Sequence, residues 1–65
     1  MKRVVWRLPL SACDAVCYLV REGAHVALRV EHGDECVLAE MMADETAALR
    51  RAEEVRRTLK TRLRH

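Results

Sequence analysis

The stretch Leu28–Ala39, LRVEHGDECVLA, contains the pattern that decides the fold. Two runs of alternating apolar and polar residues meet there at the pair Gly33-Asp34. Alternation with a period of two is typical of a strand that is buried on one face, and a Gly-Asp pair between two such runs is a strong turn signal. The stretch therefore predicts a β-hairpin with a two-residue turn.

A second hairpin is predicted immediately before the first. Residues 15–21, AVCYLVR, are rich in β-branched and aromatic residues, and Glu22-Gly23 can form the turn that follows them. Two consecutive hairpins make a three-stranded antiparallel meander over residues 15–42. With these turns, the strand pairing gathers one apolar set on one face of the sheet: Ala15, Cys17, Leu19, Val26, Leu28, Val30, Val37, Ala39 and Met41. A shift of one residue in either hairpin would move part of this set to the other face.

The hydrophobic period changes after Ala43. Asp44 is a good N-cap residue, and Glu45 follows in the first turn, where a carboxylate suits the helix dipole. An amphipathic helix is therefore predicted over residues 45–63. Its apolar side consists of Ala48, Leu49, Ala52, Val55, Leu59 and Leu63. We expect this side to pack on one face of the meander.

The length of 65 residues allows one domain, covering residues 1–65. We expect an α+β fold in which the meander carries one C-terminal amphipathic helix on one face. Residues 1–9 contain a short β-like run that ends at Pro9, and we expect a fourth strand or a flap there. A chain this short buries only about 60% of the surface of its unfolded form, so it gains much from a partner.

The face that the helix leaves uncovered is predicted to be apolar. It carries Val16, Tyr18, Val20, Ala27 and Leu38, together with Arg29 and Cys36. Since a solvated face of an antiparallel sheet is normally polar, the N-terminal segment or a second copy of the chain is expected to cover it. The residues expected at the interface of such a homodimer are Trp6, Val16, Tyr18, Val20 and Leu38. Scattered apolar residues on a surface are common and are the alternative.

Two pairs of residues have spacings that resemble those of a zinc finger: Cys13-x-x-x-Cys17 and His32-x-x-x-Cys36. Structural zinc needs four ligands that converge in a tetrahedron. In the predicted pairing, Cys17 lies on the covered face, Cys36 lies on the opposite face and His32 lies at the hairpin tip. These ligands do not converge, so we expect no metal and no cofactor.

The residue types and spacings of a catalytic site are not found in the sequence. Cys13 is the only cysteine outside a predicted strand, and no motif for a thiol nucleophile accompanies it. Asp44 and Glu45 are explained by helix capping. Gly23 and Gly33 belong to turns rather than to a phosphate-binding loop. We therefore expect that the protein is not an enzyme.

Basic residues are concentrated at the C-terminal end. Residues 1–44 carry five basic and seven acidic side chains, whereas residues 45–65 carry seven basic and three acidic ones. Such an end can bind nucleic acid or an acidic protein. The residues expected to contact nucleic acid are Arg29, Arg57, Lys60 and Arg64. Cations also suit the C-terminal end of a helix and keep a surface soluble, which explains them without a partner.

We expect a cytoplasmic protein with no membrane association. No stretch approaches the roughly 20 apolar residues that a membrane span needs. The apolar part of the N-terminal stretch is short and is interrupted by Arg7, which is unlike a signal peptide. Three cysteines are an odd number, which fits free thiols better than a closed set of disulfides.

The region from Val16 to Leu59 resembles small uncharacterised bacterial proteins in which three strands precede one helix. In this region LRVEHGDECVLAE is followed by DETAALRRAEEVRRTL. It is also similar to the arm-type DNA-binding domains at the start of phage integrases, which read DNA with the face of a three-stranded sheet. That likeness implies a role for Arg29, although the rest of this face is mostly aliphatic. A third similarity is to antitoxin modules in which a strand precedes an acid-capped helix.

Together these patterns predict a self-associating protein-interaction or regulatory module. A small nucleic-acid-binding protein that uses Arg29 and the basic end of the helix is the second hypothesis. The two differ in their response to salt, because binding to nucleic acid weakens steeply as salt rises and apolar association does not.

Overall fold

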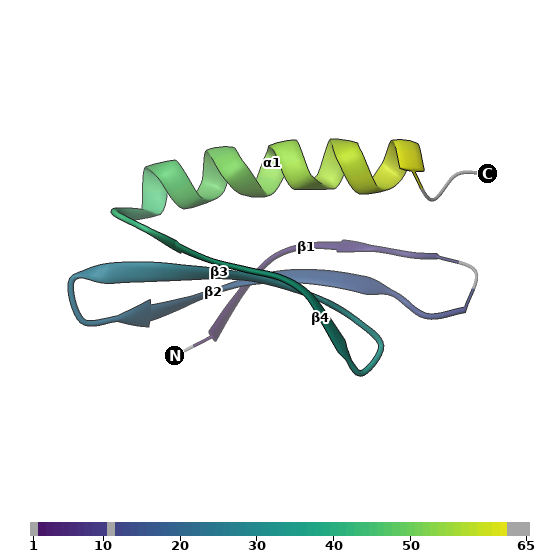
Figure 1. Cartoon of the computed structure of the whole chain (residues 1–65), viewed down its shortest axis with the longest axis horizontal. Coiled ribbons are helices and arrows are strands. Elements are labelled where there is room, and N and C mark those ends of the chain that lie inside the picture. Colours follow the sequence, from purple (N-terminus) through teal and green to yellow (C-terminus); the bar gives the residue numbers. More distant parts are fainter. Residues whose placement is uncertain (1, 11, 63–65) are drawn as a thin grey trace.

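The computed structural model describes residues 2–10 and 12–62. It contains four strands, β1 (Lys2–Leu8), β2 (Ala15–Glu22), β3 (His25–His32) and β4 (Glu35–Met42), followed by helix α1 (Glu45–Arg62). The strands form one antiparallel sheet in the order β1-β2-β3-β4, and α1 lies along one face of it (Figure 1). We call this face the covered face and the other one the open face. The predicted α+β fold is confirmed, with the N-terminal segment as a fourth strand.

Strand β1 forms one edge of the sheet rather than a flap over the open face. It pairs with β2, where Trp6 lies opposite Cys17, and Val5 is an extra residue that forms a β-bulge. The bulge lets Val5 and Trp6 both pack against the core under α1. Trp6 Nε1 also donates a hydrogen bond of 2.9 Å to the carbonyl oxygen of Ala52 in α1. Trp6, which was expected at a dimer interface together with residues of the open face, therefore lies on the covered side of the sheet.

The turn between β2 and β3 is Gly23-Ala24, one residue later than predicted. Gly23 has a φ of 63°, which glycine adopts without a Cβ clash, and it occupies the first position of the loop, as in type II′ turns. The pairing shifts by two residues, so that Leu19 lies opposite Leu28 rather than Val26. Because the shift is an even number, every side chain of both strands keeps its predicted face.

The turn between β3 and β4 is Gly33-Asp34, as predicted, but the pairing after it changes within β4. A β-bulge at Val37 adds one residue to β4, and beyond it Leu38 pairs with Val30. An odd shift exchanges the two faces of a strand. Leu38 and Met42 consequently pack against the core under α1.

The faces predicted for the second half of β4 are therefore wrong. Ala39 lies opposite Arg29 and Met41 lies opposite Ala27, so both belong to the open face. Leu38, which was expected on the open face, belongs to the covered face. The bulge brings Leu38 under the helix in place of the smaller Ala39, and it exchanges Met41 for Met42.

Helix α1 begins directly after its predicted cap. Asp44 Oδ1 accepts a hydrogen bond of 2.8 Å from the backbone nitrogen of Ala47, and the carbonyl oxygen of Asp44 accepts one of 3.1 Å from the nitrogen of Ala48. The predicted end of the helix at Leu63 lies outside the described residues, which reach Arg62.

The core lies between α1 and the covered face. Ala48, Ala52 and Val55 form the buried side of the helix. They pack against the sheet at its centre, where the fully buried side chains are Cys17, Leu28 and Val30. The small alanines allow a close approach of helix and sheet. Dense packing requires this approach, because the core side chains are mostly small and aliphatic.

Candidate functional site

The open face exposes less apolar surface than the sequence predicts. Tyr18 lies at its centre and is only 5% exposed, and its neighbours on β2, Val16 and Val20, are half-buried. These three residues are the part of the predicted interface that does lie on this face, since Trp6 and Leu38 pack under α1. The observed face therefore offers a partner a smaller apolar surface than predicted.

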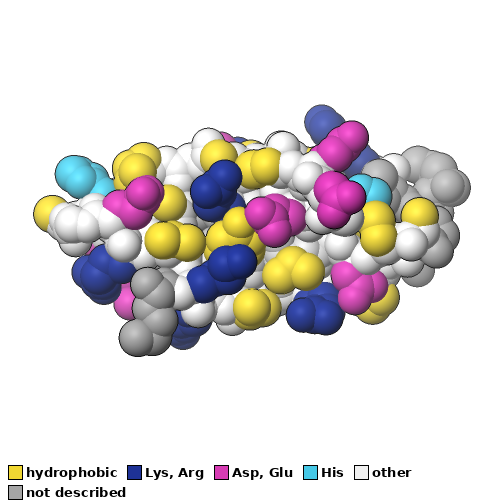
Figure 2. All heavy atoms as spheres, turned by 90° about the horizontal axis from the view of Figure 1, so that it is seen from below, with side chains coloured by type: hydrophobic (Ala, Val, Ile, Leu, Met, Phe, Trp, Pro, Cys, Tyr) yellow, Lys and Arg dark blue, Asp and Glu magenta, His cyan; other side chains and the backbone are white. Residues whose placement is uncertain are grey.

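Charged side chains surround Tyr18. Its hydroxyl donates a hydrogen bond of 2.6 Å to Glu31 Oε2, and Lys2 Nζ lies 4.4 Å from the centre of its ring. The hydrogen bond to Glu31 raises the pKa of Tyr18, because an ionised phenolate would face a carboxylate. Arg29 lies opposite Tyr18 on β3. Figure 2, which views this face, shows apolar, basic and acidic side chains interspersed rather than one continuous apolar patch.

The predicted nucleic-acid contacts lie on two sides of the molecule. Arg29 is exposed on the open face, whereas Arg57 and Lys60 are exposed on α1, which covers the opposite face. Arg57 Nε is 3.4 Å from Glu53 Oε1, so part of its charge is compensated. Arg64 lies outside the described residues. The described contacts therefore do not combine into one basic surface.

Two further arginines of α1 are engaged in ion pairs. Arg51 donates to both oxygens of Glu40 on β4, at 3.0 and 3.1 Å, and a third nitrogen donates to Glu54 at 3.0 Å. Arg56 donates to both oxygens of Glu53, at 2.8 and 3.0 Å. The guanidinium group of Arg51 lowers the pKa of Glu40. The helix surface thus has a smaller excess of free positive charge than its composition suggests.

The three cysteines are free thiols in three different environments. Cys17 is fully buried, and burial raises the pKa of its thiol to about 11. Cys36 is exposed, and Cys13 is half-buried beside the turn that contains Gly33. Within residues 2–10 and 12–62, no three His, Cys, Asp or Glu side chains come close enough to hold a metal ion. His32 Nε2 is buried and has no hydrogen-bond partner among the described residues.

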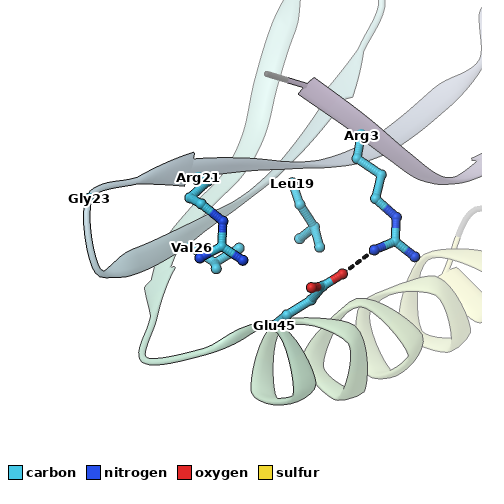
Figure 3. A pocket seen from close by; sticks show the side chains of 6 residues that line it. All are labelled: Arg3, Leu19, Arg21, Gly23, Val26 and Glu45. Carbon is cyan, nitrogen blue, oxygen red and sulfur yellow. Dashed lines mark hydrogen bonds and ion pairs between the residues drawn. The ribbon is translucent and has the colours of Figure 1, made fainter.

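A hollow of about 610 Å³ lies between the first turn of α1 and the β2–β3 hairpin (Figure 3). Leu19 and Val26 form its apolar floor, and Arg3, Arg21 and Glu45 surround it. Arg3 forms an ion pair with Glu45 and so links β1 to the start of the helix. The hollow is wide open to solvent, and Glu45, the carboxylate among its lining residues, is paired with Arg3.

A second hollow is a groove between β4 and the C-terminal half of α1. It has a volume of about 410 Å³. Its apolar lining comes from both elements, and arginines stand at its rim; the lining residues are Val37, Leu38, Arg51, Val55, Thr58, Leu59 and Arg62. We call it the β4–α1 groove. It lies along an edge of the sheet, where β4 has a neighbour on one side and none on the other among the described strands.

The exposed apolar side chains gather on this same strand. The large hydrophobic residues that are exposed among the described ones are Val4 on β1 and Val37 and Met41 on β4, with exposed fractions of 52%, 46% and 57%. Sequence reasoning missed the groove because it placed Val37 inside the core. The signal that could have found it is the need of the covered face for large side chains, which Leu38 satisfies better than Ala39.

No helix in the described part of the chain is both long and apolar enough for a bilayer crossing. Comparisons with protein-family models, with curated proteins and with solved structures found no match to this chain.

Proposed function

We propose that this chain is a non-catalytic interaction module that acts by self-association, and that it associates through the β4–α1 groove rather than through the open face. The observation that carries this proposal is the position of Val37. The bulge removes its side chain from the core and leaves it 46% exposed at the rim of an apolar groove. Unlike the exposed Val4, Val37 adjoins an apolar lining of Leu38, Val55 and Leu59, and adjoining apolar side chains of this kind are typical of contact surfaces.

The two edges of the sheet differ in a way that supports this proposal. Edge strands usually carry lysine, arginine or proline, which discourage pairing with another chain. β1 contains Lys2, Arg3 and Arg7 and is followed by Pro9. β4, with the sequence ECVLAEMM, contains none of these residue types. Both edge strands have a bulge, but β4 carries two charged residues, Glu35 and Glu40, and no nearby proline, so its edge opposes association less than that of β1.

The proposal includes a cytoplasmic location, which the three free thiols support. Binding to nucleic acid is the competing hypothesis. The ion pairs of Arg51, Arg56 and Arg57 weaken it, because these charges are already compensated within the chain. Exposed basic residues such as Lys60 and Arg62 still allow a weak electrostatic attraction, which salt would abolish.

Sedimentation equilibrium at tens of micromolar protein tests the proposal, in low salt of about 50 mM and high salt of about 500 mM. We expect a dimer in both, because apolar burial is insensitive to screening. Val37→Lys should give a monomer with an unchanged far-UV circular dichroism spectrum. Val4→Lys, an exposed valine on the other edge, is the matched control and should remain a dimer.

A wild-type chain that stays monomeric under both conditions would refute self-association. Duplex DNA added to the low-salt sample tests the competing hypothesis in the same experiment. A complex that forms with DNA at low salt and disappears at high salt, with a monomeric free chain, would favour nucleic-acid binding instead.

A further inference from the structure

We infer that the dimer has a two-fold axis beside Thr58, with the two α1 helices antiparallel and Glu54 of each copy facing Arg62 of the other. This inference rests on the proposed function, since it specifies how two copies meet at the β4–α1 groove. It names two residues that decide whether a second copy fits.

The charge pattern on α1 is complementary to itself under such an axis. Glu54, Thr58 and Arg62 are spaced four residues apart, so they follow one another along the same side of the helix. A two-fold axis at the middle residue brings the first residue of one copy opposite the third residue of the other. Glu54 then meets Arg62 twice in the dimer, and unlike charges face each other at both ends.

Both charged groups are available for this contact. The side chain of Glu54 is 61% exposed, although one of its oxygens also accepts a hydrogen bond from Arg51. A carboxylate has two oxygens and can accept further hydrogen bonds. Arg62 is exposed, and it forms no ion pair with any residue of the described ranges.

The same axis brings the apolar linings of two grooves together. Thr58 and Leu59 line the groove between Arg51 at one end and Arg62 at the other, and Val37 and Leu38 line it from the sheet. Two copies related by an axis at Thr58 therefore face each other groove to groove, with the β4 edges side by side and antiparallel and Val37 at the rim of each groove. Val37 of each copy becomes less exposed, which removes apolar surface from water.

The β4–α1 side is the larger of the two sides that could meet a second copy. Figure 1 looks along the shortest axis of the molecule, with the sheet on edge and β4 passing in front of the other strands. The outline of the side seen there spans 38 × 21 Å. The open face, which is bounded by the 38 Å and 14 Å dimensions, is about a third smaller.

A charge exchange tests the inference. In Glu54→Arg, two arginines of opposite copies would face each other, and in Arg62→Glu, two glutamates would. We expect each single variant to raise the dimer dissociation constant at least about tenfold, and the double variant to restore it to within about threefold of the wild type, because both pairs are re-formed with reversed sign. Sedimentation equilibrium measures all four dissociation constants.

Lys60→Glu is the control for the change in net charge, since Lys60 lies on α1 outside the groove lining and is exposed. It should leave the dissociation constant within about threefold of the wild-type value. Circular dichroism and thermal unfolding of each variant establish that the monomer still folds. The weakening in the single variants should also diminish at high salt, as expected for facing charges rather than for a lost apolar contact.

The outcomes separate this inference from the proposed function. A dimer that is unaffected by either single variant, or that the double variant does not restore, would overturn the Glu54–Arg62 pairing while self-association stands. A wild-type monomer would overturn both. Loss of the dimer in Val37→Lys together with restoration in the double charge variant would support both.

Discussion

The two edge strands, β1 and β4, contain the same irregularity with opposite results. Each has one extra residue that forms a bulge, at Val5 in β1 and at Val37 in β4. In β1 the bulge turns two neighbouring side chains, Val5 and Trp6, toward the helix. In β4 it leaves Val37 exposed at a groove and brings Leu38 into the core.

The comparison shows that the effect of a bulge depends on which part of the helix lies over the strand. Over β1 the indole of Trp6 finds the backbone of α1 and donates a hydrogen bond to Ala52. Over β4 the helix provides Leu59 and Thr58, with a groove between them and the strand. One edge is therefore closed by the chain's own helix, whereas the other edge remains available for a second molecule.

The largest expected effect on stability comes from deleting the side chain of Trp6, which joins β1 to α1. Trp6→Ala should lower the free energy of unfolding by about 3 kcal/mol, because it deletes a partly buried indole together with its hydrogen bond to the carbonyl of Ala52. Val4→Ala, on the same strand but exposed, should change it by less than about 0.5 kcal/mol. Urea unfolding followed by circular dichroism measures both free energies. Similar costs at the two positions would show that Trp6 stabilises the fold no more than the exposed Val4 does.

A smaller effect is expected at the turn that begins β4. Gly33 has a φ of 63°, and a Cβ there would lie 3.1 Å from the Sγ of Cys13. Gly23, at the other hairpin, has the same φ with open space around it. Gly23→Ala should therefore cost about 1 kcal/mol for the backbone alone, and Gly33→Ala should cost more.

A double-mutant cycle with Cys13→Ala isolates the steric part at Gly33. The extra cost of Gly33→Ala over Gly23→Ala should shrink when the sulfur is removed. Equal costs at the two glycines would contradict the expected clash between a Cβ at position 33 and the sulfur of Cys13.

The smallest effect is expected for the ion pair that links β4 to the helix. Arg51 lowers the pKa of Glu40, so this pair contributes stability above the ordinary glutamate pKa of 4.5 and loses it as pH falls through the lowered value. Glu40→Gln should cost less than about 1 kcal/mol at neutral pH, because about a third of each side chain is exposed. The difference from the wild type should shrink as the pH falls below 4.5.

Chemical unfolding of both proteins between about pH 3 and pH 7 measures this dependence. Glu35→Gln, on the same strand and without an ion pair in the described part of the chain, is the control. A constant difference in unfolding free energy between wild type and Glu40→Gln over the whole range would show that the ionisation of Glu40 does not contribute to stability.

Much of the fold follows from local patterns. The two turns contain the only glycines of the chain, Gly23 and Gly33, and the change of period after Ala43 places the helix and its Asp44 cap. The faces of β2 and β3 are also predicted well, because an even error in the first turn leaves them unchanged. The candidate site is different, since Trp6, Leu38 and the charged cover of Tyr18 all depend on contacts between distant segments.

The sequence by itself determined the number, order and antiparallel pairing of the elements from residue 15 onward, because turn residues, alternation and helix capping act over a few neighbouring positions. The tertiary structure decided which residues of β1 and β4 lie under the helix. A bulge costs little locally, and its position is chosen by the size of the side chains that the helix and sheet must enclose together. That choice leaves Val37 outside the core, and with it the groove through which we propose that two copies of this chain meet.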